Sequence, residues 1–79
     1  MVLRHAQSML RDICKVVGQR IRQLRDERGI SQEVLAGLAD IDRSNISRIE
    51  SGRAEPGLRT VQRIAAALGV KLTDLLSGL

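Results

Sequence analysis

The segment Ser31–Arg53 constrains the fold more than any other part of the chain. Its sequence, SQEVLAGLADIDRSNISRIESGR, has the apolar spacing of two short amphipathic helices separated by a tight turn. The positions expected to face inward are Leu35, Ala36, Ala39, Ile46 and Ile49. Because helices of about eight residues are not stable alone in water, both must pack on a larger helical framework.

Other parts of the chain have the apolar spacing needed to form that framework. Helices are predicted over residues 1–16, 17–28, 58–68 and 72–77, where apolar residues recur every three or four positions. Gly18 leaves open whether the first two are separate or form one long helix, because a glycine inside a helix costs only about 1 kcal/mol. No segment alternates like a strand, so the sequence predicts an all-α fold with five or six helices.

Local signals mark the ends of these helices. Ser31 is predicted to cap the helix that begins at residue 32, and Asp42 is predicted to cap the helix over residues 43–51. Gly29 is predicted to end the preceding helix in a left-handed conformation, and Gly52 is placed to end the second short helix. The expected organisation is one compact five-helix domain over residues 1–79. Its two-helix unit spans residues 32–51, and residues 1–16 form an additional N-terminal helical segment.

The composition narrows the range of partners. The chain contains no Phe, Trp or Tyr, so its core has to be built from Leu, Ile, Val and Ala. The aromatic stacking platforms of many single-strand and RNA-binding modules are therefore excluded. Thirteen basic and nine acidic residues give a net charge of +4, which is a moderate bias toward a polyanionic partner.

Cysteine usage and hydropathy indicate a cytoplasmic protein. Cys14 is the only cysteine, which rules out an internal disulfide and fits a reducing compartment. Its expected role is that of a small apolar residue on a helix face. No apolar run approaches the roughly 18 residues of a membrane span. Arg11, Asp12 and Lys15 interrupt any signal-peptide core, so we expect no membrane association.

Catalysis is not expected. His5 stands alone near a terminus, and Cys14 has no partner histidine. The acidic residues form no pair at active-site spacing, and no cluster of metal ligands occurs. The sequence therefore predicts a protein that is not an enzyme and that needs no cofactor, metal or small-molecule ligand.

The second short helix carries polar side chains opposite its apolar ones. These polar residues are Arg43, Ser44, Asn45, Ser47 and Arg48. Their side chains have the donors that contact phosphate oxygens and base edges in a DNA major groove. This pattern of polar residues therefore predicts that the second short helix binds double-stranded DNA.

Several short matches to one family recur at fixed spacing between residues 17 and 76. They are Arg20-Ile21-Arg22 with Leu24-Arg25, Gly29-Ile30-Ser31-Gln32-Glu33 with Ala36, Ile46-Ser47 with Ile49-Glu50, Gly52, Pro56, and Ile64-Ala65 with Ala67-Leu68-Gly69-Val70. Together they resemble the phage-repressor/Cro-like (XRE) family of helix-turn-helix DNA-binding regulators. The triplet Asp42-Arg43-Ser44 followed by Ile46-Ser47 also resembles the controller proteins of restriction–modification systems.

Three positions depart from the family pattern. Asp40 occupies the turn position where the family usually has glycine, although Asp is among the few residues that tolerate a left-handed backbone. Gly57 and Lys71 stand where a hydroxyl residue often caps the last two helices of the family. These departures weaken the predicted starts of those two helices more than the DNA-binding unit.

The resemblance implies roles for individual residues. Gln32 would hold a phosphate at the N-terminus of its helix, although a solvated glutamine is the simple alternative. Arg43, Ser44, Ser47 and Arg48 match positions that face base edges or nearby phosphates, and either arginine could read guanine or contact only phosphate. Asn45 and Arg53 match contacts to the DNA backbone. Arg25 and Glu50 match a structural salt bridge of the family.

The function that the resemblance implies is transcriptional regulation by a homodimer that binds a two-fold symmetric double-stranded operator. An antitoxin that binds both DNA and a toxin is an alternative, and a protein-interaction module of the same fold is another. The arginine and serine residues on the second short helix argue against the module, because a protein-docking helix is expected to show apolar anchors.

Leucines near the C-terminus suggest where the dimer forms. Leu72, Leu75, Leu76 and Leu79 recur as a stripe on a helix too short to be stable alone. We expect this stripe to lie in the dimer interface. The alternative is that all four leucines close the core of a single chain.

Overall fold

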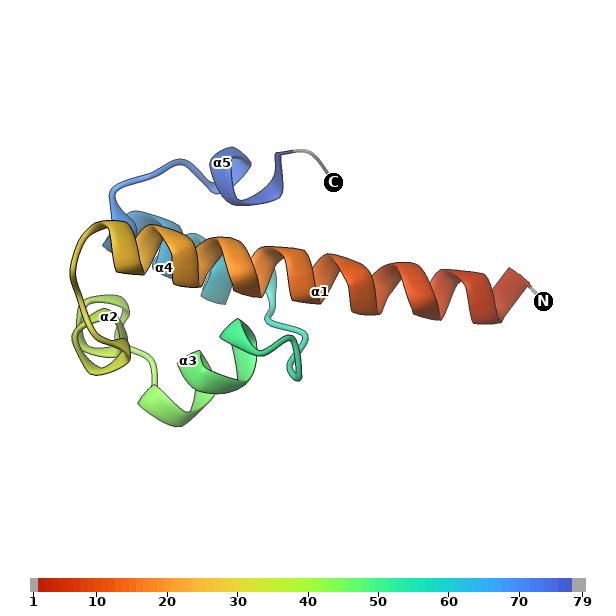
Figure 1. Ribbon diagram of the computed structural model, residues 1–79, viewed down its shortest axis with the longest axis horizontal. Helices are drawn as coiled ribbons and strands as arrows, with labels where there is room; N and C mark the ends of the chain where they lie inside the picture. The colour runs from red at the N-terminus through yellow and green to blue at the C-terminus, as the bar shows by residue number, and fades with distance from the viewer. Residues whose placement is uncertain (1, 78–79) are drawn as a thin grey trace.

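The computed structural model describes the backbone of residues 2–77 and the side chains of residues 9 and 12–77. These residues form five helices and no strand, which confirms the all-α prediction. Figure 1 shows the helices arranged around one long rod, the first helix. The helices are α1 (Val2–Glu27), α2 (Gln32–Ala39), α3 (Arg43–Glu50), α4 (Leu58–Leu68) and α5 (Leu72–Leu76).

Helix α1 is continuous through Gly18, which settles the alternative between two helices and one. A Cβ atom at Gly18 would lie 2.3 Å from the Ile49 carbonyl oxygen and 2.7 Å from that of Glu50. Real Cβ atoms do not approach oxygen so closely, so α3 can end against α1 only where α1 has a glycine. The glycine therefore serves close packing of two helices and does not interrupt α1.

The ends of α2 agree with the local signals in the sequence. The Ser31 hydroxyl accepts a hydrogen bond from the Val34 amide at 3.1 Å. Asp40 ends the helix with a left-handed backbone at φ 56°, the conformation expected from its place in the turn. Asp42 occupies the N-cap position of α3, but its side chain makes no capping hydrogen bond, so the predicted cap is wrong in this respect. Its charge still favours the positive end of the helix dipole.

Helix α5 is held at both ends by contacts outside the usual capping residues. The Lys71 backbone amide donates to the Asp74 carboxylate at 2.8 Å, which is the N3 half of a capping box, while the Lys71 side chain makes no cap bond. At the other end, the Arg20 guanidinium donates to the carbonyl oxygens of Leu75, at 3.3 Å, and of Ser77. A helix of five residues is thereby fastened to the side of α1.

One cluster of apolar side chains from all five helices forms the core. Its members are Val17, Ile21, Leu35, Ala36, Ala39, Ile46, Ile49, Val61, Ile64, Ala65, Leu68 and Leu75.

Leu75 is 0% exposed within a single chain, which favours the alternative that it closes the core of that chain, and its contact with a second chain stays a prediction. It faces inward because α5 packs on both α1 and α4. Leu72 and Leu76 are partly buried against the same core, and Leu79 lies outside the described residues. Among residues 2–77, no helix combines the length and apolar character that crossing a membrane requires.

Candidate nucleic-acid interface

Helix α3 separates an apolar underside from a polar outer face. Ile46 and Ile49 are buried beneath the helix and hold it against the core. The exposed side chains on the opposite face are Arg43, Ser44, Ser47 and Arg48, whereas Asn45 is half-buried at the edge. The four exposed residues fall on one side because they recur at positions one, two, five and six of a helix with 3.6 residues per turn. The structure therefore brings the predicted contact residues of α3 together.

Two further predicted residues lie at the ends of the two-helix unit. Arg53 is exposed just beyond α3, where its backbone amide donates to the Arg48 carbonyl at 2.9 Å. Gly52, at φ 76°, makes the left-handed turn that brings the chain back in this way. Gln32 is half-buried at the first turn of α2. Its place at a helix N-terminus suits an anion, because the first backbone amides of a helix have no partners within it.

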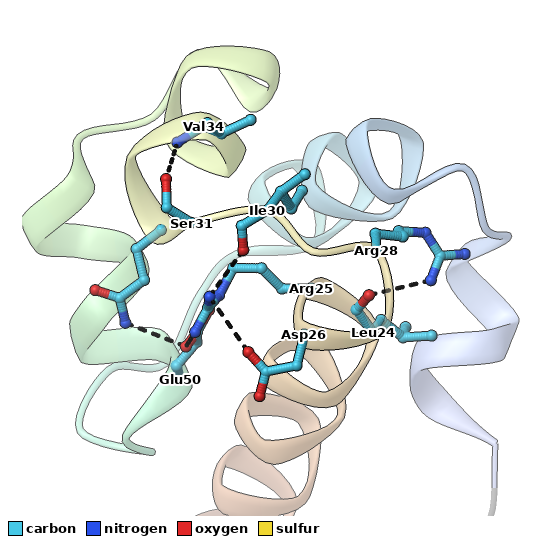
Figure 2. Close-up of polar contacts among 9 residues, drawn as sticks. Leu24, Arg25, Asp26, Arg28, Ile30, Ser31, Val34 and Glu50 are labelled. Atoms are coloured by element: carbon cyan, nitrogen blue, oxygen red, sulfur yellow. Dashed lines mark hydrogen bonds and ion pairs between the residues drawn. The ribbon is translucent and has the colours of Figure 1, made fainter.

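A buried ion pair fastens α3 to α1. Arg25 Nε lies 2.8 Å from Glu50 Oε2, and Arg25 Nη2 lies 3.1 Å from Glu50 Oε1, which is the bidentate geometry of a strong pair (Figure 2). The Arg25 side chain is 12% exposed and the Glu50 side chain 4%. The hydrogen bond to Glu50 raises the pKa of the Arg25 guanidinium, against the opposing effect of burial. Arg25 also donates to the Ile30 carbonyl at 2.9 Å, which ties in the loop before α2.

The same carboxylate reaches the N-terminus of α2. Gln32 Nε2 donates to Glu50 Oε1 at 3.1 Å. Glu50 therefore links α1, α2 and α3, and it orients the amide of Gln32. Sequence reasoning missed this contact, because residues 32 and 50 are brought together by the turn between α2 and α3 and by no local spacing.

The charges around α3 leave its arginines accessible. Arg43 Nε lies 3.8 Å from Glu33 Oε1, but both side chains are more than half exposed, so solvent screens this pair. Arg48 takes part in no ion pair among the described side chains. The buried acid of the region, Glu50, is neutralised by Arg25. The outer face thus presents positive charge although the two-helix segment contains several acids.

The described part of the chain offers little support for other chemistry at this surface. No group of three or more His, Cys, Asp or Glu side chains among these residues could hold a metal ion. The described buried polar atoms of the side chains all have hydrogen-bond partners. What the face of α3 presents is hydroxyl and guanidinium groups, which suit contacts to an anionic, hydrogen-bonding surface.

Comparison with known proteins identifies the family. A family profile described as helix-turn-helix matches residues 21–75, so the chain belongs to this XRE-type helix-turn-helix family.

Individual relatives and structures are also similar. The control protein C.BamHI of Bacillus amyloliquefaciens is 41% identical over 69 residues, which cover 86% of this chain and 85% of that protein. The crystal structure of the restriction–modification controller protein C.AhdI from Aeromonas hydrophila superposes with a TM-score of 0.77 at 37% identity, over 78% of this chain and 94% of that one. The structure of SinR, the master regulator for biofilm formation, in complex with DNA superposes with a TM-score of 0.72 at 35% identity. The superposition covers 77% of this chain and 98% of the SinR chain. The chain spans about half the length of several other curated relatives.

Proposed function

We propose, from membership of this helix-turn-helix family, that the protein is a sequence-specific transcriptional regulator that binds double-stranded DNA as a homodimer on a two-fold symmetric operator. The observation that carries the proposal is the polar outer face of α3, held in place by buried isoleucines and by the Arg25–Glu50 pair. An α-helix of this kind fits the major groove of DNA, whose base edges present hydrogen-bonding groups.

Residues on and beside this face fall into three groups by the contact we propose for them. Arg43 and Arg48 read base edges, because a guanidinium can donate two parallel hydrogen bonds to guanine. Ser44 and Ser47 lie between them and contribute shorter-range contacts to bases or phosphates. Gln32, Asn45 and Arg53 flank the face, and we assign them to the phosphate backbone, where they set the register of the helix in the groove.

Similarity to control proteins favours one class within the family. The matches to C.BamHI and C.AhdI cover most of the length of both proteins. Those two are described as a control protein and a restriction–modification controller protein. We therefore propose this class ahead of an antitoxin or a protein-interaction module. The exposed face of α3 carries no apolar anchor, which favours DNA over a protein partner for this helix.

Selection of bound sites from random duplex DNA tests the proposal directly. The recovered sequence is expected to contain two inverted half-sites. Against this operator, Arg43→Ala and Arg48→Ala should each weaken binding by about 1–3 kcal/mol and relax the preference at one base pair. Gln32→Ala and Arg53→Ala should weaken binding to all duplexes by similar factors.

An arginine elsewhere on the surface supplies the matched control. Arg59 is exposed on α4, away from α3, so Arg59→Ala removes the same charge without removing a proposed contact. It should change operator affinity far less than Arg43→Ala or Arg48→Ala. Equal losses from all three substitutions would mean that binding is only a non-specific attraction, and absence of any selected sequence would refute sequence-specific recognition.

A further inference from the structure

An apolar groove of about 370 Å³ lies between the middle of α1 and the start of α4. The apolar residues that line it come from α1, α4, the loop before α4 and α5. They include Ile13, Cys14, Val17, Pro56, Leu58 and Leu76. Leu58 is 73% exposed and Ile13 37%, so neither is covered by the chain itself. Exposed apolar side chains gathered along one groove make this face a candidate docking surface.

Beyond the groove, α1 continues as a helix past the body of the molecule. Figure 1 shows its N-terminal half projecting from the bundle without another helix beside it. The sequence repeats apolar residues at Leu3, Ala6, Leu10, Ile13 and Val17, which is the spacing of a single helix face. Apolar residues repeated on one face of a helix that has no neighbouring helix indicate that a partner packs along that face.

We propose that the partner is a second copy of this chain. The N-terminal halves of two α1 helices pair antiparallel, and each lies along the groove of the other in a two-fold interface. Ile13 and Val17 belong both to the repeated face and to the groove, so the two form one continuous side of α1. A two-fold axis across this side covers both surfaces at once, because each copy supplies the same patch.

One charge contact favours this pairing, against the like charge of the two N-terminal segments. Residues 2–16 contain Arg4, Arg11 and Lys15 against the single acid Asp12, so this segment is positive overall. Glu55 lies at the edge of the groove that the incoming helix would occupy. The interface therefore brings a basic helix next to the carboxylate of Glu55.

Spacing along α1 connects this dimer to DNA, and this step rests on the proposed function. The end of α3 touches α1 at Gly18. Because a helix rises about 1.5 Å per residue, the two copies of Gly18 lie about 3 Å further apart for every residue between Gly18 and the two-fold axis. A separation of about 34 Å between recognition helices then places the axis about 11 residues before Gly18, near residue 7. Since α3 runs from Gly18 toward the C-terminal end of α1 (Figure 1), the axis lies nearer to Gly18 than residue 7 does.

The direction of the two-fold axis also allows both α3 helices to face one DNA duplex. In Figure 1, α3 lies below α1 while α4 lies behind it, so the groove and α3 occupy different sides of α1. An antiparallel pair that meets on the groove side leaves both α3 helices facing the same way. Residue 10, the middle of the apolar repeat from Leu3 to Val17, lies on that side of residue 7, so packing and DNA spacing favour the same part of α1.

Sedimentation of the free protein, without DNA, tests the interface. The wild-type chain is expected to be dimeric at tens of micromolar. Ile13→Glu and Leu58→Glu should each weaken the dimer at least about tenfold, because a charge replaces a buried apolar contact. Leu58 is so exposed that its substitution does not disturb the fold of one chain. Leu38→Glu is the matched control, because Leu38 is 61% exposed on α2 and does not line the groove.

Cys14 reports the location of the contact in the unmodified protein. As the only cysteine and a residue of the groove, it should react with iodoacetamide more slowly as the protein concentration rises through dimer formation. A monomeric wild type, with a Cys14 reaction rate independent of concentration, overturns the proposal. A dimer that survives both Ile13→Glu and Leu58→Glu overturns it too, because the interface then lies elsewhere. Failure of the protein to select DNA would appear only in the binding experiment and would count against the proposed function.

Discussion

Replacing Glu50 by alanine should destabilise the fold more than any other substitution of an acidic residue. Glu50 accepts two hydrogen bonds from Arg25 and one from Gln32, and its side chain is almost fully buried. Removing the carboxylate leaves the Arg25 guanidinium buried without its main partner. It also removes the acceptor of the Gln32 amide, so the single carboxylate that links α1, α2 and α3 is lost.

The expected magnitude follows from the contacts that remain. Breaking a buried ion pair by removing one partner costs about 3–5 kcal/mol. After Glu50→Ala, Arg25 keeps its 2.9 Å hydrogen bond to the Ile30 carbonyl and a 3.5 Å contact to the exposed Asp26. We therefore expect the lower end of the range, about 3 kcal/mol. Arg25→Ala should cost more, because it leaves the more deeply buried Glu50 with Gln32 alone.

Urea unfolding at a fixed protein concentration measures these losses, since dimerisation also shifts apparent stability. Glu33→Ala is the matched control, because Glu33 forms an exposed 3.8 Å pair with Arg43 and should contribute only about 0–1 kcal/mol. A double replacement, Arg25→Met with Glu50→Leu, should recover most of the stability because no buried charge is left unpaired. If Glu50→Ala and Glu33→Ala unfolded at the same urea concentration, the Arg25–Glu50 pair would not contribute to stability as we expect.

Two further predictions concern packing. Gly18→Ala should destabilise the protein, because the added Cβ would meet the carbonyl oxygens at the end of α3. Gly37→Ala should instead stabilise α2 by about 1 kcal/mol, because the space around Gly37 is open. The two substitutions should therefore shift the thermal unfolding midpoint in opposite directions, and equal shifts would contradict this prediction. Leu75→Ala should lower the free energy of unfolding by about 2–5 kcal/mol, because it truncates a core side chain. The loss should be the same at low and high protein concentration. A loss that grows with protein concentration would indicate that Leu75 contributes to a dimer interface.

Helix positions were predictable where the signals are local. Ser31, Asp40 and Gly69 each decide a helix end through their own backbone or side chain, and the predicted bounds of α2 and α4 match the structure. The predictions for α3 and α5 ran one residue too far, to Ser51 and Ser77, which the structure places as C-caps. The final residue of a helix depends on where the chain goes next, and spacing alone does not contain that information.

The candidate site divides in the same way. The polar face of α3 follows from helical spacing, because Ile46 and Ile49 on the core side force the arginines and serines outward. The contact between Gln32 and Glu50 does not follow from spacing, because it forms only when the turn at Asp40 folds α2 back on α3. The orientation of Leu75 could not be predicted from the sequence for a related reason. A stripe at spacings of three and four shows that a face is apolar, but the packing of α5 on α1 and α4 decides that Leu75 faces inward.

Gly18 shows how a residue type can be noticed in a sequence and its purpose still be missed. In the sequence, its helix penalty of about 1 kcal/mol suggested only a possible break between two helices. In the structure the penalty is accepted because a side chain at this point would hold the end of α3 away from α1. Moving that end outward would also lengthen the Arg25–Glu50 contact, whose hydrogen bonds are 2.8 and 3.1 Å. The Arg25–Glu50 ion pair and the position of α3 against α1 therefore both depend on the missing Cβ atom at Gly18. In the proposed dimer, the distance from Gly18 to the two-fold axis would also set the separation of the half-sites.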